Sequence, residues 1–186
     1  KEKVLNDLIE FTNQRIVSHL DELSISKDLI KATCFIDPSA EKKIMNILDL
    51  KNRINTINQL KGKPDFSEIQ KVISRVSKLA ESGNLKTTIF SYKNYVNPDL
   101  FEKECENKVF EFIKELEEII KFNNWDYFQL FKLFESNANN INELFDNEKG
   151  VLIMAGNPEI RNNRLNLLGL VRNYSLKIAD FTLFNS

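Results

Sequence analysis

The chain has 186 residues, with 26 basic and 27 acidic side chains, one histidine, two cysteines and five glycines. A single histidine excludes sites built on paired histidines, and Cys34 and Cys105 lie too far apart in sequence for a C-x-x-C motif. The scattered glycines form no glycine-rich phosphate-binding loop. No apolar run is long enough to cross a membrane, and so few cysteines suggest buried thiols in a reducing compartment, which predicts a cytoplasmic protein.

Apolar residues recur at helical spacing along most of the chain. In the first part, the predicted elements are a helix over about 2–23 with an apolar stripe from Leu5 to Leu23, a short helix capped at Ser26–Asp28 and running to Thr33, a break at 37–39, a long helix from Ser39 to about Leu60, and a helix from Pro64 to Gly83. Apart from the break, all of these segments are predicted to be helical, so no sheet is expected here.

The second part of the chain follows the same pattern. Its predicted elements are a loop over 84–97, a long helix with Pro98 in its first turn and the core stripe Phe101, Cys105, Val109, Phe112, Leu116 and Ile119, a turn at 123–124, helices over 125–135 and 141–145, a short apolar piece over 151–154, and a last helix from Asn157 to about Thr182. We therefore predict an all-α fold, a bundle of five to seven helices. Residues 39–186 are expected to form this bundle. Residues 1–38 are expected to be a helical connector to an upstream domain, packed on the bundle through the Leu5–Leu23 stripe.

Acidic residues, Glu102 and Glu106 among them, occupy the other sides of the long helix over 101–121. Glu104 with Glu111, or Glu115 with Glu118, has the spacing of an acid/base pair, but no flanking apolar residues raise a carboxyl pKa, so a solvated face is the better interpretation. His19 is mid-helix and is interpreted as structural, and neither cysteine has a histidine nearby in sequence. The sequence thus predicts no catalytic and no metal site.

Basic residues form two groups at helical spacing. Lys71, Arg75 and Lys78 stand at i, i+4 and i+7, which places them on one stripe of a helix. In the last helix, Arg161 and Arg172 project well away from the apolar face, and Arg164 borders it, as the helical wheel predicts. Stacked guanidinium groups suit phosphates. The alternative is pairing within the chain with the acidic 101–121 helix, for which Arg164 is the strongest candidate.

The predicted loop mixes aromatic and basic residues. Phe90, Tyr92 and Tyr95 lie near Lys86 and Lys93. Aromatic rings beside cations can stack on unpaired bases. The alternative is that these rings simply pack the loop itself.

The C-terminal part of the chain resembles the beta subunit of the bacterial-type, two-subunit glycyl-tRNA synthetases. The segments that carry the resemblance are Asn140–Asp146, Val151–Met154, Ile160–Leu168 with its R-x-N-R-L-x-L-L pattern, Ala179–Phe181 and, more loosely, Val96–Phe101 and Ser74–Leu79. The resemblance covers roughly residues 40–186. It implies a helical anticodon-binding domain of the type shared with arginyl-tRNA synthetases (the DALR type).

The resemblance implies that the chain contacts the anticodon stem-loop of glycine tRNA within a glycine–tRNA ligase. Lys71, Arg75, Lys78, Arg161, Arg164 and Arg172 would hold RNA, and Asn162, Asn163 and the aromatic loop are candidates to read the two invariant anticodon cytosines. Catalysis, with ATP and Mg²⁺, would lie in the alpha subunit of a hetero-tetramer, and this segment would hold no cofactor. Neither DNA nor a membrane is an expected partner.

Two other functions fit the sequence. A helical protein–protein adaptor would suit the near-neutral charge and the acidic long helix. Phosphate binding weakens steeply with salt, whereas an apolar interface hardly changes, so salt separates these two hypotheses. A hydrolase built on the acidic helix would need a carboxyl group with a strongly raised pKa in a pocket.

Overall fold

The computed structural model describes residues 2–34, 43–122 and 125–184. Its elements are α1 (Glu2–Glu22), α2 (Lys27–Cys34), α3 (Ile47–Leu60), α4 (Pro64–Ala80), the 3₁₀ turn η2 (Pro98–Leu100), α5 (Glu104–Phe122), α6 (Tyr127–Glu143), α7 (Pro158–Leu176) and the 3₁₀ turn η3 (Phe181–Leu183). The described ranges contain seven α-helices and no strand, which confirms the all-α prediction. None of these helices has the length and apolarity needed to cross a membrane.

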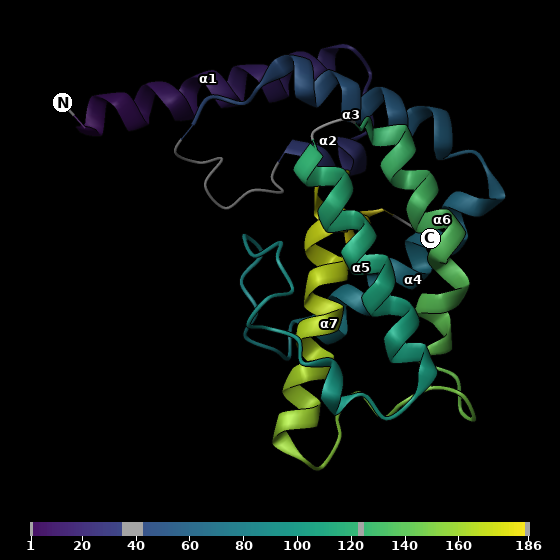
Figure 1. Ribbon diagram of the computed structural model, residues 1–186. Coiled ribbons are helices and arrows are strands. Elements are labelled where there is room, and N and C mark those ends of the chain that lie inside the picture. The colour runs from purple at the N-terminus through teal and green to yellow at the C-terminus, as the bar shows by residue number, and fades with distance from the viewer. Residues whose placement is uncertain (1, 35–42, 123–124, 185–186) are drawn as a thin grey trace.

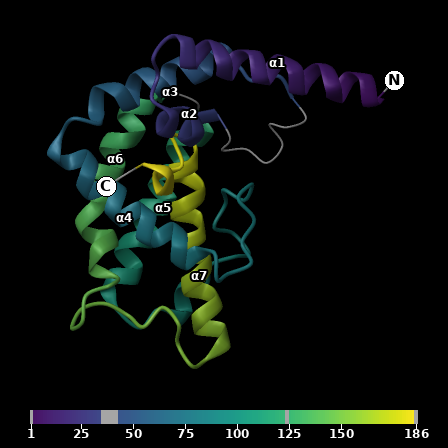
Figure 2. The same ribbon diagram turned by 180° about the vertical axis from the view of Figure 1, so that it is seen from behind.

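The helices α5, α6 and α7 run side by side as the body of the bundle, α4 crosses them obliquely and packs against α7 and α6, and α2 and α3 lie at one end of it (Figures 1 and 2). Helix α7 is the central one and packs against both α4 and α5. Apolar side chains cover most of its circumference, which is why this helix is enclosed by its neighbours. Its fully enclosed apolar residues are Leu165, Leu167, Leu168, Leu170, Val171 and Tyr174.

The turn η3 closes the end of the bundle where α2 lies. The backbone N–H of Asp180 donates to the carbonyl oxygen of Ala32 in α2 at 2.8 Å. From α4, Gln70 donates to the carbonyl oxygen of Phe184 at 2.7 Å and Ser74 to that of Phe181 at 3.0 Å. The buried apolar residues of α2 also belong to the same hydrophobic core as those of α3 to α7.

Helix α1 projects away from the bundle (Figure 1). Ile9 is buried and Ile16, Val17 and Leu20 pack partly against the core. Asn13 fixes this face, because its side chain donates to the carbonyl oxygen of Lys43 and accepts from the backbone N–H of Met45, each at 2.9 Å. The predicted packing of the whole Leu5–Leu23 stripe is wrong, since Leu5, Leu8 and Leu23 are all more than half exposed.

The predicted break at 37–39, the helix start at Ser39 and the boundary at residue 38 lie outside the described residues. Helix α3 begins at Ile47, later than predicted. Asn46 caps it, because its side chain accepts from the backbone N–H groups of Leu48 and Asp49, each at 3.1 Å. Such a cap satisfies amides that have no partner within the helix.

Three further boundaries differ from the predictions. The last helix, α7, ends at Leu176 and not near Thr182, where the separate 3₁₀ turn η3 lies. Pro98 opens the short turn η2 and not the long helix, which begins only at Glu104. The predicted helices over 125–135 and 141–145 are one helix, α6, which begins at a capping box of Asp126 and Gln129. Buried Ala138 continues the apolar stripe across the asparagine-rich middle of α6, so the helix does not break there. The predicted turn at 123–124 lies outside the described residues.

The segment over 84–97 is a loop, as predicted, and it lies against α7 (Figure 1). The buried side chain of Asn173 donates to the carbonyl oxygens of Lys86 at 2.8 Å and Ile89 at 2.6 Å. Tyr174 donates its hydroxyl hydrogen to the carbonyl oxygen of Phe90. Polar side chains of the central helix therefore satisfy the backbone of this loop.

Candidate nucleic-acid interface

The predicted basic stripe of α4 is on the surface. Lys71, Arg75 and Lys78 are all exposed, while the apolar residues between them, such as Val72 and Val76, are buried. None of the three cations forms a salt bridge to a carboxylate among the residues described. The stripe therefore presents three positive charges to solvent along about two turns of one helix.

The middle cation of the stripe is held by an aromatic ring. The guanidinium carbon of Arg75 lies 4.2 Å from the centre of the Phe145 ring, a cation–π contact. Phe145 belongs to the turn that follows α6, and backbone hydrogen bonds from Gly150 to Asp146 (3.1 Å) and from Val151 to Leu144 (3.0 Å) close this turn. The ring thus orients Arg75 without neutralising its charge.

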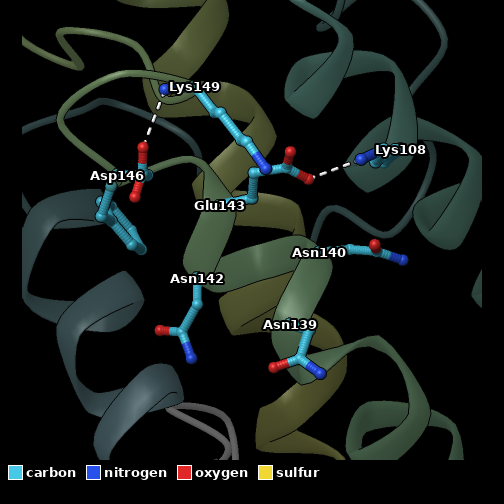
Figure 3. A pocket seen from close by; sticks show the side chains of 8 residues that line it. Lys108, Asn139, Asn140, Asn142, Glu143, Asp146 and Lys149 are labelled. Atoms are coloured by element: carbon cyan, nitrogen blue, oxygen red, sulfur yellow. Dashed lines mark hydrogen bonds and ion pairs between the residues drawn. The ribbon is translucent and has the colours of Figure 1, made fainter.

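Two shallow grooves flank this contact. The first, of about 410 Å³, lies along α4 and is lined by Pro64, Ser67, Glu68, Lys71, Val72, Arg75 and Asn142. The second, of about 480 Å³, lies between α5, α6 and the turn after α6, and is lined by Lys108, Asn139, Asn140, Asn142, Glu143, Phe145, Asp146 and Lys149 (Figure 3). Asn142 lines both grooves, so the two adjoin.

Carboxylates in the second groove are already engaged. Glu143 accepts from the amine of Lys108 at 2.6 Å, and this hydrogen bond raises the pKa of Lys108. One oxygen of Asp146 accepts from the backbone N–H groups of Lys149 (2.8 Å) and Glu148 (2.9 Å). These two backbone hydrogen bonds lower the pKa of Asp146, so the group is ionised at neutral pH.

Arg164 is not on the surface. Its side chain is only 3% exposed, and it donates to Glu106 at 2.9 Å, Glu102 at 2.6 Å and the carbonyl oxygen of Leu152 at 3.1 Å. Burial acts to lower the pKa of Arg164, but the carboxylates of Glu106 and Glu102 outweigh it and raise the pKa, so the guanidinium stays charged. The prediction that Arg164 pairs within the chain with acidic residues of the 101–121 segment, and not with phosphate, is therefore confirmed.

The placement of Glu106 on a solvated face of the long helix is wrong, because this residue is completely buried. Its second oxygen accepts from the backbone N–H groups of Glu102 (2.8 Å) and Lys103 (3.1 Å), just before α5 begins. The carboxylate therefore stabilises the start of α5 as well as Arg164. By contrast, Glu104, Glu111, Glu115 and Glu118 are exposed, as the interpretation of a solvated face predicts.

Arg172 also turns inward, although its helical position predicted a place well away from the core. It is half-buried and donates to the carbonyl oxygen of Leu85 at 2.7 Å and to the side-chain oxygen of Asn173 at 3.0 Å. Burial lowers the pKa of Arg172, against the attraction of Glu81. Its guanidinium is therefore committed to the loop over 84–97.

Arg161 and Asn162 lie near the start of α7, and this end of α7 is at the lower end of the bundle in Figure 1. Asn162 is exposed, and Arg161 is half-buried with one long contact of 3.5 Å to the carbonyl oxygen of Ala155. Asn163, by contrast, is buried and exchanges hydrogen bonds with the backbone of Asn97 at 2.7 and 2.9 Å. Of the α7 candidates, Arg161 and Asn162 keep the most accessible polar groups.

The aromatic side chains of the loop are used mainly for packing. Phe90 contacts Tyr174 and Tyr92 contacts Phe110, both edge-on, and the amine of Lys177 lies 4.1 Å from the centre of the Phe90 ring. Only Tyr95 is appreciably exposed. Packing of the loop thus accounts for Phe90 and Tyr92 but not for Tyr95.

The remaining candidate groups show no arrangement for catalysis within the described ranges. His19 is exposed on α1 and lies 3.4 Å from Glu22. Cys34 and Cys105 are buried, and burial raises the pKa of both thiols, which makes them poor nucleophiles. The described residues contain no group of three His, Cys, Asp or Glu that could hold a metal ion.

Sequence reasoning missed Asn139, Asn142 and Lys149 as possible ligand contacts. The dense run of asparagines over 137–142 was a signal, because asparagine is a weak helix former and α6 carries four of them within two turns. Phe145 was equally hidden, since its pairing with Arg75 depends on how α4 and α6 pack.

Comparison with known proteins gives one consistent name. No family model matches the chain. The chain is 33% identical over 186 residues to the glycine–tRNA ligase beta subunit of a Picosynechococcus species, and 31% and 32% identical to the proteins of that name from Gloeothece citriformis and Trichodesmium erythraeum. These matches cover 96–97% of the chain but only 26% of each relative. The chain is thus related, over nearly all its length, to about a quarter of those subunits.

Proposed function

We propose that this chain is a tRNA-binding part of the beta subunit of a glycine–tRNA ligase and that it contacts the anticodon stem-loop of glycine tRNA. The observation that carries the proposal is the exposed stripe of Lys71, Arg75 and Lys78 on α4, whose charges no carboxylate among the described residues neutralises. The relatives named glycine–tRNA ligase beta subunit support the same function.

The physical basis is the charge of RNA. Cations on a rigid helix neutralise phosphates and release counterions, and this fixes the RNA in place without reading its sequence. Bases of a single-stranded loop are then read by stacking and by hydrogen bonds to their edges. Arg161 and Asn162 complete the set of accessible polar groups, while Arg164 and Arg172 serve the fold.

Several further features belong to this proposal. The bundle would be an anticodon-binding domain of the DALR type. Glycylation, with ATP and Mg²⁺, would take place in the alpha subunit of a hetero-tetrameric enzyme in the cytoplasm. This chain would contribute RNA contacts and no cofactor site.

The test is a titration of the chain with a glycine tRNA anticodon stem-loop at 50 mM and 200 mM salt. If three phosphates are neutralised, the affinity should fall about 20- to 40-fold between the two conditions. The same hairpin with both anticodon cytosines replaced should bind more weakly if the anticodon is read.

Two results would contradict the proposal. One is the absence of hairpin binding at low salt and the highest usable protein concentration. The other is binding that persists unchanged when Lys71, Arg75 and Lys78 are all replaced by alanine. All three are exposed, so the triple variant should retain the fold, and its thermal midpoint provides the control.

A second candidate is a helical protein–protein adaptor, and one observation favours it. Val4, Leu8 and Phe11 form an exposed apolar stripe at i, i+4 and i+7 on α1, each at least 55% exposed. Such a stripe is typical of a helix that binds another protein surface. Under this hypothesis the partner would dissociate after Leu8→Asp and would be insensitive to salt.

A further inference from the structure

The first three turns of α1 separate polar from apolar side chains completely. At about 100° per residue, the apolar side chains of residues 2–11 fall within an arc of about 160°, and the polar ones occupy the remaining side. The apolar set is Val4, Leu5, Leu8, Ile9 and Phe11. The bundle buries only Ile9, at one edge of this arc, whereas the other four are 55–70% exposed. These turns therefore carry an apolar face that the described residues leave largely uncovered.

The bundle contacts a different side of α1. Ile9, Asn13, Ile16 and Leu20 form the side that packs. The exposed stripe of Val4, Leu8 and Phe11 points roughly 140° away from that side. The first turns of α1 also lie far from the other helices in both views (Figures 1 and 2). A small shift of α1 on the bundle thus cannot cover the stripe, which needs a surface on the opposite side.

A helix that projects from its bundle gains stability from such a surface. Short helices are marginal in water by themselves, and most of the stability of an amphipathic helix comes from packing of its apolar face. In the first three turns of α1, Ile9 supplies the buried contact. A second surface against the exposed stripe would hold these turns helical.

The stripe is small for an interface between separate molecules. With Leu5 beside it, it offers on the order of 400 Å² of apolar surface, so two copies joined through it would bury roughly 800 Å². Stable interfaces between separate proteins bury about 1,200–2,000 Å². A tethered partner needs less area, because a linker makes the association intramolecular, at an effective concentration of about a millimolar. The small area therefore favours a partner in the same polypeptide.

The relatives contain a large part that has no counterpart in this chain. The matches to the subunits from Picosynechococcus and Gloeothece citriformis cover 97% of the chain, so at least most of α1 belongs to the matched region. They cover only 26% of each relative, so about three quarters of those subunits lies outside that region. This remainder is a tethered body large enough to offer a packing surface.

We propose that the exposed stripe of α1 packs against the part of the glycine–tRNA ligase beta subunit that lies outside the matched region. The contact fixes the bundle to the rest of the subunit and so sets the orientation in which α4 presents its cations. This inference rests on the proposed place of the chain in such a subunit, but it does not depend on RNA binding.

The test compares amide hydrogen exchange of residues 2–11 in two proteins, the chain of 186 residues and the complete beta subunit that contains it. Both are measured without the alpha subunit and without RNA. In the chain alone these amides should exchange fast, because little packs on the turns that bear them. In the complete subunit they should exchange at least about tenfold more slowly, because opening of the helix then breaks the proposed contact.

Leu8→Asp places a charge at the centre of the stripe and should restore fast exchange in the complete subunit. Asn6→Asp is the matched control, because it adds the same charge at an exposed position on the polar side of the same turns, and exchange should stay slow. In the chain alone, both variants should keep the thermal midpoint of the unaltered chain, since both side chains are exposed there. This measurement shows that the bundle itself remains folded.

Three results would overturn the inference. Equal exchange in the two proteins would show that nothing in the subunit covers the stripe. Slow exchange that persists in Leu8→Asp would place the contact elsewhere on α1. Slow exchange in the chain alone, with a dimer that Leu8→Asp dissociates in sedimentation, would make a second copy the occupant. If the complete subunit protects the stripe but no hairpin binds at low salt, RNA binding is wrong and this inference stands.

Discussion

The cations of α4 and α7 have the same chemistry and opposite environments. Lys71 and Arg75 are exposed on a helix that packs through one face only. Arg164 is 3% exposed and binds two carboxylates, and Arg172 binds carbonyl and amide oxygens of its surroundings. The difference lies in the neighbours, because α7 has packed segments on most sides and those segments supply acceptors. A regular row of cations binds an external ligand only where the fold leaves it without acceptors.

The buried and the exposed cations also differ in what they contribute to folding. A buried, fully hydrogen-bonded ion pair contributes to the specificity of the fold, and loss of one partner leaves an uncompensated charge. An exposed cation contributes little to folding and keeps its charge for a ligand. The following changes test the two sides of this contrast, in order of expected effect.

The largest effect is expected from Arg164→Met. This change leaves the completely buried Glu106 without its guanidinium partner and should lower the free energy of unfolding by about 3–5 kcal/mol. Urea denaturation measures it. Adding Glu106→Gln removes the unpaired charge and should recover at least about 1 kcal/mol. A loss below about 1 kcal/mol in the single variant would show that the pair does not hold this part of the core.

A smaller effect is expected from Gly150→Ala, in the turn that carries Phe145. A Cβ atom at Gly150 would lie 2.4 Å from the carbonyl oxygen of Asp146 and 2.6 Å from that of Leu144, so the backbone of the turn must shift. We expect a loss of about 1–3 kcal/mol in thermal or urea unfolding. Gly156→Ala is the control, because nothing lies within 4 Å of its Cβ position. Equal effects of the two changes would refute the steric explanation.

Changes on the exposed side should leave the fold almost intact. Lys71→Ala should change the free energy of unfolding by less than about 0.5 kcal/mol. Arg75→Ala also loses the contact with Phe145 and should cost about 0.5–1 kcal/mol. Each change should lower the slope of log affinity against log salt by about 1 in hairpin titrations. An unchanged slope together with a large loss of stability would mean that the cations of α4 serve the fold, as those of α7 do, and not RNA binding.

The smallest effect concerns pH. The pKa of Asp146 lies below its usual value of 3.8 because the backbone N–H groups of Lys149 and Glu148 bind its carboxylate. A lowered pKa in the folded state gives stability that is present above pH 4 and is lost as the pH falls through the folded value. The unaltered chain should therefore exceed Asp146→Asn in thermal midpoint at neutral pH, and the gap should narrow in acid. A gap that is constant with pH would contradict this.

The periodicity of apolar residues predicts the helices well, because the buried face of a helix repeats about every 3.6 residues. Cys105, Val109, Phe112 and Leu116 were assigned to the core from spacing alone, and all four are buried. Helix ends were less predictable, since Pro98 opens a separate 3₁₀ turn and the asparagines of α6 continue a helix. Local signals of this kind are overridden when a partner such as Glu106 or a continuing apolar stripe decides the boundary.

The candidate site was only partly predictable. The exposure of Lys71, Arg75 and Lys78 follows from the apolar positions of the same helix. The burial of Arg164 with Glu106 does not, because the two residues are 58 positions apart and only tertiary packing brings them together. For the same reason, the contact of Arg75 with Phe145 and the amides of the groove became visible only in the structure.

The hydrogen bond from Asp180 to Ala32 bears on how this bundle forms during synthesis. The two residues lie about 150 positions apart, so at translation rates of about 5–20 residues per second α2 leaves the ribosome roughly 7–30 s before the turn that completes its packing. During that interval, Leu29 and Ile30, which are buried in the finished bundle, lack their final neighbours. The growing chain thus exposes the apolar face of the short amphipathic helix α2 to chaperones or to aggregation until nearly all of this sequence has been made.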